Sequence, residues 1–553
     1  MRLLTASRLR RLIQIFCLGL FFYLLSLTAW PADDGFLSSN FFLRLDPLTA
    51  LAVPLTAREI IGQLAPGLVV ILLALIIGRI FCGFICPFGI TLDLVSWLKR
   101  RVKGHSGTAA NPLCPSWRRL KYFILAATLS AATAGVSLIF WVSPIPLITR
   151  FYALLMHPLF LSAADFLTRS GDSSFMTLSW LGFTNGPVKI RAFDTLWFLL
   201  ILFGAIFWLE WRWPRFWCRV LCPGGALMAL LSRRPLWRRR VDGNCRRCGR
   251  CYQKCPAGTI SPDGLATGYS ECLTCQNCVR VCPVGAVKFG FGPEAPSSEP
   301  RVESGATILS PFSRRTFISS AALGLGLAWF QSSGLSAAGR LAGAGVRPSL
   351  LPVRPPGSRP EALFLALCLR CGVCLKACPT NALAPTFLSS GPNGLFSPRL
   401  FARRGPCEPE CHRCGQVCPT GAIFHLPLAE KRWAKMGTAL VLKNSCLAWA
   451  EDRRCVVCQE VCPYGSIDLV KGPGLTAPAP LVRAERCFGC GYCEYHCPMS
   501  SPAIIVESKA ALRLNNADYR KTAQTLGLEL DPAARALEEI PDDQLPPGFL
   551  ELK

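Results

Sequence analysis

Acidic residues are scarce in this sequence: 34 Asp and Glu stand against 60 Lys and Arg, and the formal net charge is +26. Such an excess of one sign is typical of nucleic-acid-binding proteins. Here, however, the basic residues gather beside long apolar runs, as they do in membrane proteins. The charge therefore predicts contact with a lipid bilayer and no nucleic-acid partner. No flavin-binding or DNA-binding segment is evident, which argues against a sensor or regulator.

Cysteine and apolar residues are abundant instead. The 553 residues include 30 cysteines, and 51% are hydrophobic. Thirty cysteines are typical either of a disulfide-rich secreted scaffold or of a metal protein. The long apolar runs make a small secreted scaffold implausible, and at roughly 150 residues per domain the length predicts three or four domains.

Four apolar runs approach the ~20 residues needed to cross a bilayer. Basic residues cluster at the start, between 99 and 121 and between 212 and 240, which places both ends of a four-helix unit in the cytoplasm. The predicted fold class is multi-domain: an α-helical membrane domain with four transmembrane helices and a two-fold repeat, plus α+β ferredoxin-like [4Fe–4S] domains. The runs are residues 12–30, 64–81, 122–142 and 195–211.

The same C-x3-C-P pattern occurs twice, in "RIFCGFICPFG" (79–89) and "RFWCRVLCPGG" (215–225). Cysteines at i and i+4 share one helical face, and a duplicated two-helix unit would bring four thiols together. We expect a redox site there, either a further iron–sulfur cluster or dithiol/disulfide couples. Alternatively, Pro and Gly end the helices and the cysteines pack as small apolar side chains. The four residues are Cys82, Cys86, Cys218 and Cys222.

Past residue 240, 24 cysteines form six sets of four, mostly with the spacing C-x2-C-x2-C-x3-C-P of [4Fe–4S] ferredoxins. Zinc sites generally use separated pairs of ligands, and disulfides within such tight runs would be strained. The sequence therefore predicts six [4Fe–4S] clusters. The sets are Cys245, Cys248, Cys251 and Cys255; Cys272, Cys275, Cys278 and Cys282; Cys368, Cys371, Cys374 and Cys378; Cys407, Cys411, Cys414 and Cys418; Cys446, Cys455, Cys458 and Cys462; Cys487, Cys490, Cys493 and Cys497.

In such runs the fourth cysteine binds the partner cluster. Small residues beside the ligands leave room for backbone N–H groups to approach the sulfurs. Variant spacing in the fourth and fifth sets puts Cys407 and Cys446 in question, while Cys17 and Cys114 lie outside all sets. For the first two sets the predicted ligand groups are Cys245, Cys248, Cys251 and Cys282, and Cys272, Cys275, Cys278 and Cys255.

A segment in the middle of the chain, "SRRTFISSAALGLGLAWF" (313–330), resembles a twin-arginine export signal, with Arg314, Arg315 and Phe317. The alternative is an ordinary membrane anchor with a basic flank. As a signal it places the first two cysteine sets inside the cytoplasm and the last four outside. The predicted domains are 1–240 (membrane), 241–290 (two clusters, cytoplasmic), 291–360 (linker with the signal or a fifth membrane segment), 361–510 (four clusters, periplasmic) and 511–553 (C-terminal tail).

Residues 1–290, with the two C-x3-C-P motifs and "RRLKYFIL", resemble NapH-type quinol dehydrogenase membrane subunits. Residues 313–505, with "VRPPGSRPEALFLALCLRCGVCLKACP", resemble NapG/MauM-type periplasmic ferredoxins. The chain looks like a fusion of the two. The resemblance implies a quinol dehydrogenase of the bacterial cytoplasmic membrane that oxidises menaquinol or ubiquinol and passes electrons to a periplasmic cytochrome or terminal reductase.

Two other functions stay open at this point: an accessory protein for maturation of a respiratory metalloenzyme, and an electron conduit of opposite direction. The four-cluster arm favours quinol oxidation over the accessory role. Five polar residues near helix ends are candidates for binding quinone oxygens or relaying protons, or else for membrane anchors and helix caps. They are Arg79, Arg215, Lys121, Glu210 and His157.

Overall fold

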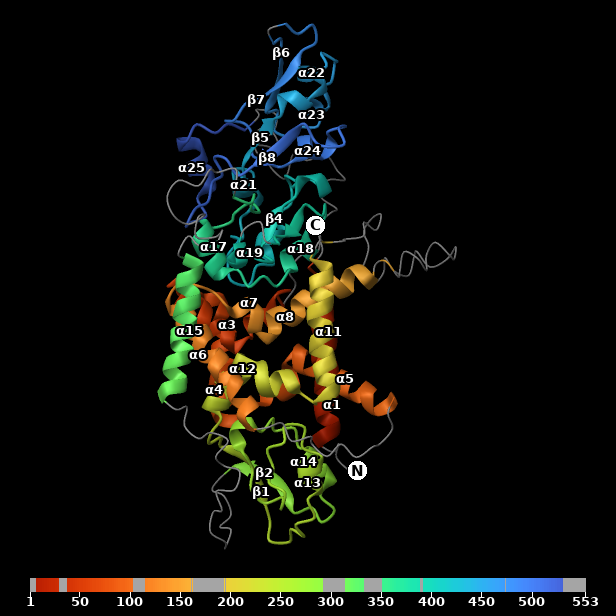
Figure 1. Ribbon diagram of the computed structural model, residues 1–553, viewed down its shortest axis with the longest axis vertical. Coiled ribbons are helices and arrows are strands. Elements are labelled where there is room, and N and C mark those ends of the chain that lie inside the picture. The colour runs from red at the N-terminus through yellow and green to blue at the C-terminus, as the bar shows by residue number, and fades with distance from the viewer. Residues whose placement is uncertain are drawn as a thin grey trace, which may run out of the picture. The chain divides into compact units, whose positions relative to one another are not determined.

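The computed structural model describes residues 6–28, 37–102, 115–160, 162, 193, 195–291, 314–332, 351–387, 391–472 and 474–530. The chain divides into two compact units. The first contains residues 1–27, 33–332 and 366–371, and the second contains residues 28–32, 333–365 and 372–553. Figure 1 shows the elements of both units.

Helices make up most of the described part of the first unit (Figure 1). Three π-helices interrupt them among the described residues. The α-helices are α1 (Ala6–Ser26), α2 (Phe41–Arg44), α3 (Pro47–Ala57), α4 (Ala65–Ile77), α5 (Pro87–Val102), α6 (Leu120–Thr133), α7 (Ile139–Val142), α8 (Pro144–Arg150), α11 (Leu196–Arg212), α12 (Pro223–Leu231) and α15 (Arg314–Ser332). The π-helices are η2 (Phe81–Ile85), η4 (Phe151–Met156) and η5 (Trp217–Leu221).

Two of the four apolar runs are not continuous helices. Gly78 caps α4 with φ 82°, and Gly135, with φ 83°, follows α6. Glycine adopts this left-handed conformation without strain, so it ends both helices inside runs that hydropathy alone reads as unbroken. Within the described residues one helix, Arg8–Ser26, has the length and composition to cross a membrane. Pro47–Ala57, Gly62–Ile77 and Phe317–Phe330 are apolar but shorter.

The twin-arginine-like segment forms helix α15, which lies beside α6 (Figure 1). Its Gly324 faces Ala127 and Ser130 so closely that a Cβ would stand 2.3 Å from the Ala127 oxygen. Small residues let helix backbones approach in this way in membrane bundles. The segment therefore packs as a further helix of the first unit.

Residues 237–291 of the first unit form an α+β domain of the ferredoxin type. Strands β1 (Trp237–Val241) and β2 (Val287–Phe291) pair antiparallel, with Trp237 opposite Phe291. Short helices α13 (Arg250–Gln253) and α14 (Asn277–Val281) follow cysteine-rich loops. Cys251, Cys278, Ile260 and Val287 form the buried core, so the cysteines themselves are core residues.

The second unit repeats this pattern of short strand pairs and one-turn helices. Antiparallel pairs are β3 (Leu383–Pro385) with β4 (Pro398–Leu400), β5 (Thr438–Val441) with β8 (Ile504–Glu507), and β6 (Ile467–Val470) with β7 (Ala479–Val482). From residue 361 on, the helices are α17 (Glu361–Leu367), α18 (Val373–Ala377), α19 (Gly391–Gly394), α20 (Arg413–Gln416), α21 (Leu428–Lys431), α22 (Leu447–Ala450), α23 (Val457–Glu460), α24 (Tyr492–His496) and α25 (Tyr519–Thr525).

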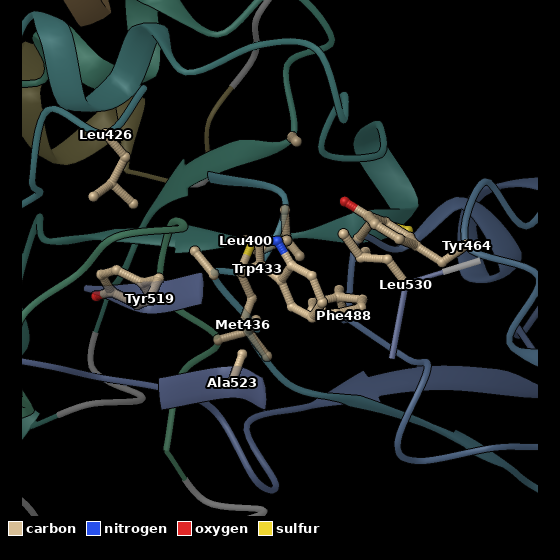
Figure 2. Packing of buried hydrophobic residues seen from close by; sticks show 13 residues of the cluster. Leu400, Leu426, Trp433, Met436, Tyr464, Phe488, Tyr519, Ala523 and Leu530 are labelled. Carbon is tan, nitrogen blue, oxygen red and sulfur yellow. The ribbon is translucent and has the colours of Figure 1, made fainter. Parts of the chain in front are cut away.

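An apolar core holds the second unit together around Trp433 and Phe488 (Figure 2). Tyr519, Ala523 and Leu530 belong to this core and are almost fully buried. The core thus extends beyond residue 510, where the sequence places the start of a tail. The acidic segment near the C-terminus, for which the sequence predicts a short helix, lies outside the described residues.

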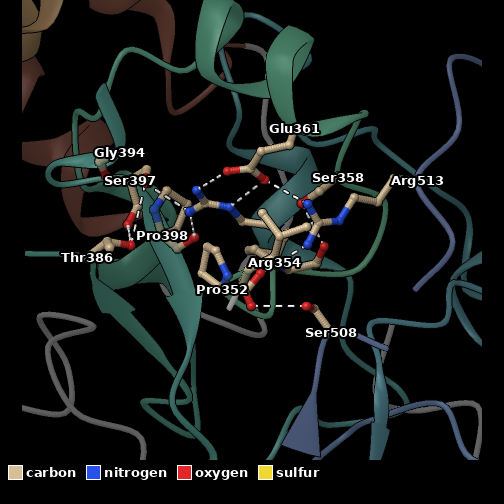
Figure 3. A network of polar contacts seen from close by, with 12 residues as sticks. Pro352, Arg354, Ser358, Glu361, Thr386, Gly394, Ser397, Pro398, Ser508 and Arg513 are labelled. Atoms are coloured by element: carbon tan, nitrogen blue, oxygen red, sulfur yellow. Dashed lines mark hydrogen bonds and ion pairs between the residues drawn. The ribbon is translucent and has the colours of Figure 1, made fainter. Parts of the chain in front are cut away.

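A buried ion-pair network fixes the segment that carries the "VRPPGSRPEALF" motif (Figure 3). Arg354 donates to Glu361 at 2.5 Å and to the carbonyl of Pro398 at 2.7 Å, and Arg513 donates to Glu361 at 2.7 Å. The two guanidinium groups overcome the effect of burial and lower the pKa of Glu361. The motif therefore has a structural role in joining three segments of the second unit.

Candidate functional site: a cavity lined by four cysteines

Both C-x3-C-P motifs fold in the same way. The first cysteine lies in a π-helix, and the second follows it with extended backbone, at φ −60° and ψ 114° for Cys86 and at φ −74° and ψ 107° for Cys222. Proline disfavours the α conformation in the residue before it and suits the first turn of a helix. Pro87 and Pro223 thus start new helices, α5 and α12, where the sequence indicated only helix ends.

The four cysteines of the motifs line one cavity. Cys86 and Cys222 are buried, and Cys82 and Cys218 are partly buried. The Cys222 sulfur accepts a hydrogen bond from Gly225 N at 3.1 Å. The rest of the lining consists of Asp46, Arg79, Met228, Pro47, Phe81, Phe88, Pro144, Gly224 and Gly225. The structure therefore brings the four predicted residues together, while their redox role stays a prediction.

Two arginines cross between the motifs. Arg215, from the second motif, donates to the carbonyl of Cys82 at 3.1 Å and to Asp93 at 2.6 Å. Arg79, from the first motif, lies against Gly225 of the second, where a Cβ would be 2.8 Å from its Nη2. Both side chains are buried. Both arginines form ion pairs in the interior of the unit, so they are not the membrane anchors that were one alternative from the sequence.

The other three polar candidates take different places. Glu210 accepts hydrogen bonds from the backbone N–H groups of Arg215 at 2.6 Å and Phe216 at 3.1 Å, so it acts as a cap. Lys121 forms an ion pair with Glu271 at 2.5 Å. His157 follows η4 and is not among the residues that line the cavity.

Arg79 has an unusual set of partners. Its Nη1 donates to Glu271 at 2.8 Å, while its Nε and Nη2 have no hydrogen-bond partner among the described residues. A buried N–H group without a partner costs free energy of about 1–3 kcal/mol. Two such groups beside four thiols favour an anionic occupant of the cavity, and four thiolates around iron would be one.

In the ferredoxin-type domain of the first unit, Cys255, Cys272, Cys275 and Cys278 line a second cavity. This is the predicted grouping, with the last cysteine of one set beside the first three of the next. Thr259 N approaches the Cys255 sulfur at 3.5 Å, and Arg239 Nη2 approaches the Cys251 sulfur at 3.7 Å. Such donors stabilise negative charge on cluster sulfurs.

The second unit groups its cysteines across sets as well. Cys446, Cys455, Cys458 and Cys497 line a cavity, where Ala503 N approaches the Cys497 sulfur at 3.4 Å. Burial raises the pKa of the Cys414 thiol, and the nearby thiols of Cys407, Cys411 and Cys378 raise it further. Cys446 thus lines a cavity with Cys455 and Cys458 of its own set, and Cys407 lies near Cys411 and Cys414 of its own set. Their ligation of clusters stays a prediction. Cys462 packs with Cys487 and Cys493.

These two cavities each gather cysteines from two different sets. Within the part of the chain that the structure describes, no three Cys, His, Asp or Glu side chains lie close enough to hold one metal ion. A cubane cluster separates its cysteine ligands, because each binds a different iron. Which cysteines bind each cluster stays a prediction, and so does the second swapped group that the sequence predicts: Cys245, Cys248, Cys251 and Cys282.

Family comparisons agree with this chemistry. A family described as "4Fe-4S binding domain" matches residues 64–104 and again 195–243, which are the two segments that contain the C-x3-C-P motifs. A "4Fe-4S dicluster domain" matches residues 239–283, and a second "4Fe-4S binding domain" family matches residues 364–384. The protein is therefore an iron–sulfur, ferredoxin-type electron-transfer protein.

Curated relatives narrow this class. The methylamine utilization ferredoxin-type protein MauM of Methylophilus methylotrophus is 38% identical over 160 residues, 28% of this chain and 69% of the relative. The ferredoxin-type protein NapG of Escherichia coli is 37% identical over 169 residues, 29% of this chain and 72% of the relative. The ferredoxin-type protein NapF of Escherichia coli is 31% identical over 150 residues, 27% of this chain and 82% of the relative. The chain belongs to the MauM/NapG family of ferredoxin-type proteins through this part of its length.

Proposed function

We propose that the protein is a membrane-bound iron–sulfur quinol dehydrogenase that passes electrons to a cytochrome or reductase outside the cytoplasm. The observation that carries the proposal is the cavity in which four cysteines, Arg79 and Asp46 meet within an apolar helical unit. A redox centre within an apolar helical unit can be reached by an electron donor that is dissolved in the bilayer. Menaquinol and ubiquinol are donors of this kind.

The membrane part of the proposal rests on the helices of the first unit. Many of their side chains expose large apolar surfaces, including those of Ile15, Phe16, Leu72 and Ile201. We assign the four predicted runs and α15 to the bilayer. The runs 64–81 and 122–142 would cross it as interrupted helices. The two-cluster domain then lies in the cytoplasm and the four-cluster unit outside it.

Bound [4Fe–4S] clusters would supply one-electron carriers. The chain's own residues position them and stabilise their negative charge. Backbone N–H groups of Thr259, Ala439, Ser466 and Ala503 approach cysteine sulfurs at 3.3–3.5 Å. The apolar lining of the four-cysteine cavity excludes water, and Asp46 is held there by Leu48 N and Thr49 Oγ1. We assign six clusters to the 24 cysteines and a seventh centre to the cavity.

Reduction of the anaerobic, detergent-solubilised protein tests this function. A short-chain menaquinol analogue should bleach the iron–sulfur absorbance of the wild type. The Cys82→Ser, Cys218→Ser double variant should lose this bleaching while dithionite still bleaches it, and its iron content should fall to about 24 atoms per chain. Normal quinol-driven bleaching in the double variant would contradict the proposal.

A reporter fused to the C-terminus tests the orientation. It should be active outside the cytoplasm, and Lys at positions 314 and 315 should block its export if the segment works as a twin-arginine signal. Replacement of the exposed Trp329, near the other end of α15, by Phe provides a control that keeps the motif. Cytoplasmic activity of the unmutated fusion would exclude an acceptor outside the cytoplasm.

A further inference from the structure

The four-cysteine cavity and the neighbouring two-cluster domain meet at the level of the backbone. Gly83 lies in η2 between Cys82 and Cys86, and a Cβ at this position would stand 2.6 Å from the carbonyl oxygen of Leu273. Leu273 is bonded to Cys272, one of the cysteines that line the cavity of the two-cluster domain. Because Gly83 has no side chain, nothing separates the two cysteine motifs at this contact.

Side chains from other helices fix this contact. Arg10 Nε and Gln14 Nε2, both on α1, donate to the carbonyl of Gly83 at 3.2 and 3.0 Å. Arg118 Nη2, from the helical part of the unit, donates to the carbonyl of Gly258 in the two-cluster domain at 3.1 Å. The two motifs are therefore held in a defined arrangement.

An ion pair joins the same two motifs. Glu271 precedes Cys272 directly and accepts hydrogen bonds from Arg79 at 2.8 Å, Lys121 at 2.5 Å and the Tyr122 hydroxyl at 2.8 Å. Two of these three donors are cationic, so the surroundings of Glu271 suit a carboxylate. Arg79 also lines the four-cysteine cavity, where its Nη2 lies beside Gly225 of the lining.

We propose that an iron–sulfur centre in the four-cysteine cavity exchanges single electrons with the Cys255, Cys272, Cys275 and Cys278 cluster across the Gly83–Leu273 contact. The Arg79–Glu271 pair, which touches both motifs, sets the difference between their reduction potentials. In each exchange one electron leaves the first centre, which is oxidised, and reduces the second; no atom is transferred. The inference rests on the proposed function for the presence of a centre in the cavity, but not for quinol as its donor.

Hydrogen bonds and nearby charges are known determinants of cluster potential. Arg79 would donate hydrogen bonds to the sulfur atoms of the centre in the cavity and so favour the reduced state of that centre. Glu271 opposes this by neutralising part of the arginine charge, and its own charge lies one residue from Cys272. A single carboxylate is therefore placed to affect both centres.

EPR-monitored redox titration of the full chain, with dithionite as reductant, tests the exchange. The signal of the first centre is identified by its loss in Cys82→Ser, Cys218→Ser, and that of the second by its loss in Cys272→Ala, Cys275→Ala. Two paramagnetic centres in contact broaden each other's lines, so removing the first centre should narrow the signal of the second. An unchanged line shape would overturn the exchange. A double variant that loses neither iron nor signal would overturn the centre itself, and with it the redox role of the cavity.

Glu271→Gln tests the ion pair, because it removes the charge and keeps a hydrogen-bonding oxygen. Both midpoint potentials should move to more positive values. The matched control is Asp242→Asn, which removes an exposed carboxylate from the same domain, where Lys288 pairs with it at 2.9 Å; it should shift neither. Equal potentials in Glu271→Gln and wild type would exclude this role.

Gly83→Ala tests the backbone contact, since the added methyl group must push Leu273 away. The line broadening should decrease although both centres keep their iron. Gly204→Ala is the control, because a Cβ at position 204 meets nothing within 4 Å. If Gly83→Ala does not fold, the line shape in the cysteine variants still decides the proposal.

Discussion

The two C-x3-C-P halves of the first unit have the same backbone conformation. They differ in the acidic residue with which the arginine of each half forms an ion pair. Each half has a π-helix, an extended cysteine and a helix that starts with proline, and each sends an arginine to the other half. Arg215 pairs with Asp93 on α5. On α12 the corresponding position is Ala229, and Arg79 pairs instead with Glu271 of the two-cluster domain. The departure from symmetry thus coincides with the place where that domain docks.

Loss of either half should have the largest effect. Cys86→Ala and Cys222→Ala should each reduce quinol oxidation to the background rate, because all four thiols line one cavity and each half supplies two. Stopped-flow absorbance with a menaquinol analogue measures this. Cys17→Ala, which lies outside the cavity, is the control. Activity retained in one variant alone would show that the halves act separately.

The arginines should differ in their effect on stability. Arg215→Gln removes contacts to both Asp93 and the carbonyl of Cys82, and breaking a buried pair costs about 3–5 kcal/mol. Arg79→Gln removes one ion pair, and Glu271 keeps Lys121 and Tyr122, so we expect a cost of about 1–2 kcal/mol. Thermal unfolding in detergent compares the two. A larger loss in Arg79→Gln would reverse the comparison.

Two glycines allow a finer test. A Cβ on Gly89 would meet the Cys82 carbonyl oxygen at 2.8 Å, which is backbone, whereas a Cβ on Gly225 would meet Arg79 Nη2 at 2.8 Å, the end of a flexible side chain. Gly89→Ala should therefore lower stability by about 1–3 kcal/mol, as overpacking does, and Gly225→Ala by less. The same thermal assay, with Gly204→Ala as reference, ranks them. Equal losses would show that Arg79 is held as rigidly as backbone.

Local patterns made much of this predictable. The spacing of cysteines predicts ferredoxin-type domains, because three ligands of each cluster come from one short run and the fourth comes from the partner run. The ends of the helices were harder to predict from the sequence. Mean hydropathy, for example, does not show that Gly78 ends α4. The partner of Arg79 lies 192 positions away, at Glu271, and no local rule could indicate it. The burial of Tyr519 was likewise invisible, because only tertiary packing creates it.

The late position of Tyr519, Ala523 and Leu530 also has a consequence for the order of events during synthesis. These residues complete a core whose other members begin at Val353 (Figure 2). The ribosome must therefore translate well past the last cysteine, Cys497, before the second unit can close. The core therefore cannot be complete before Leu530 has been synthesised, and by that point every cysteine of the six sets has been synthesised as well.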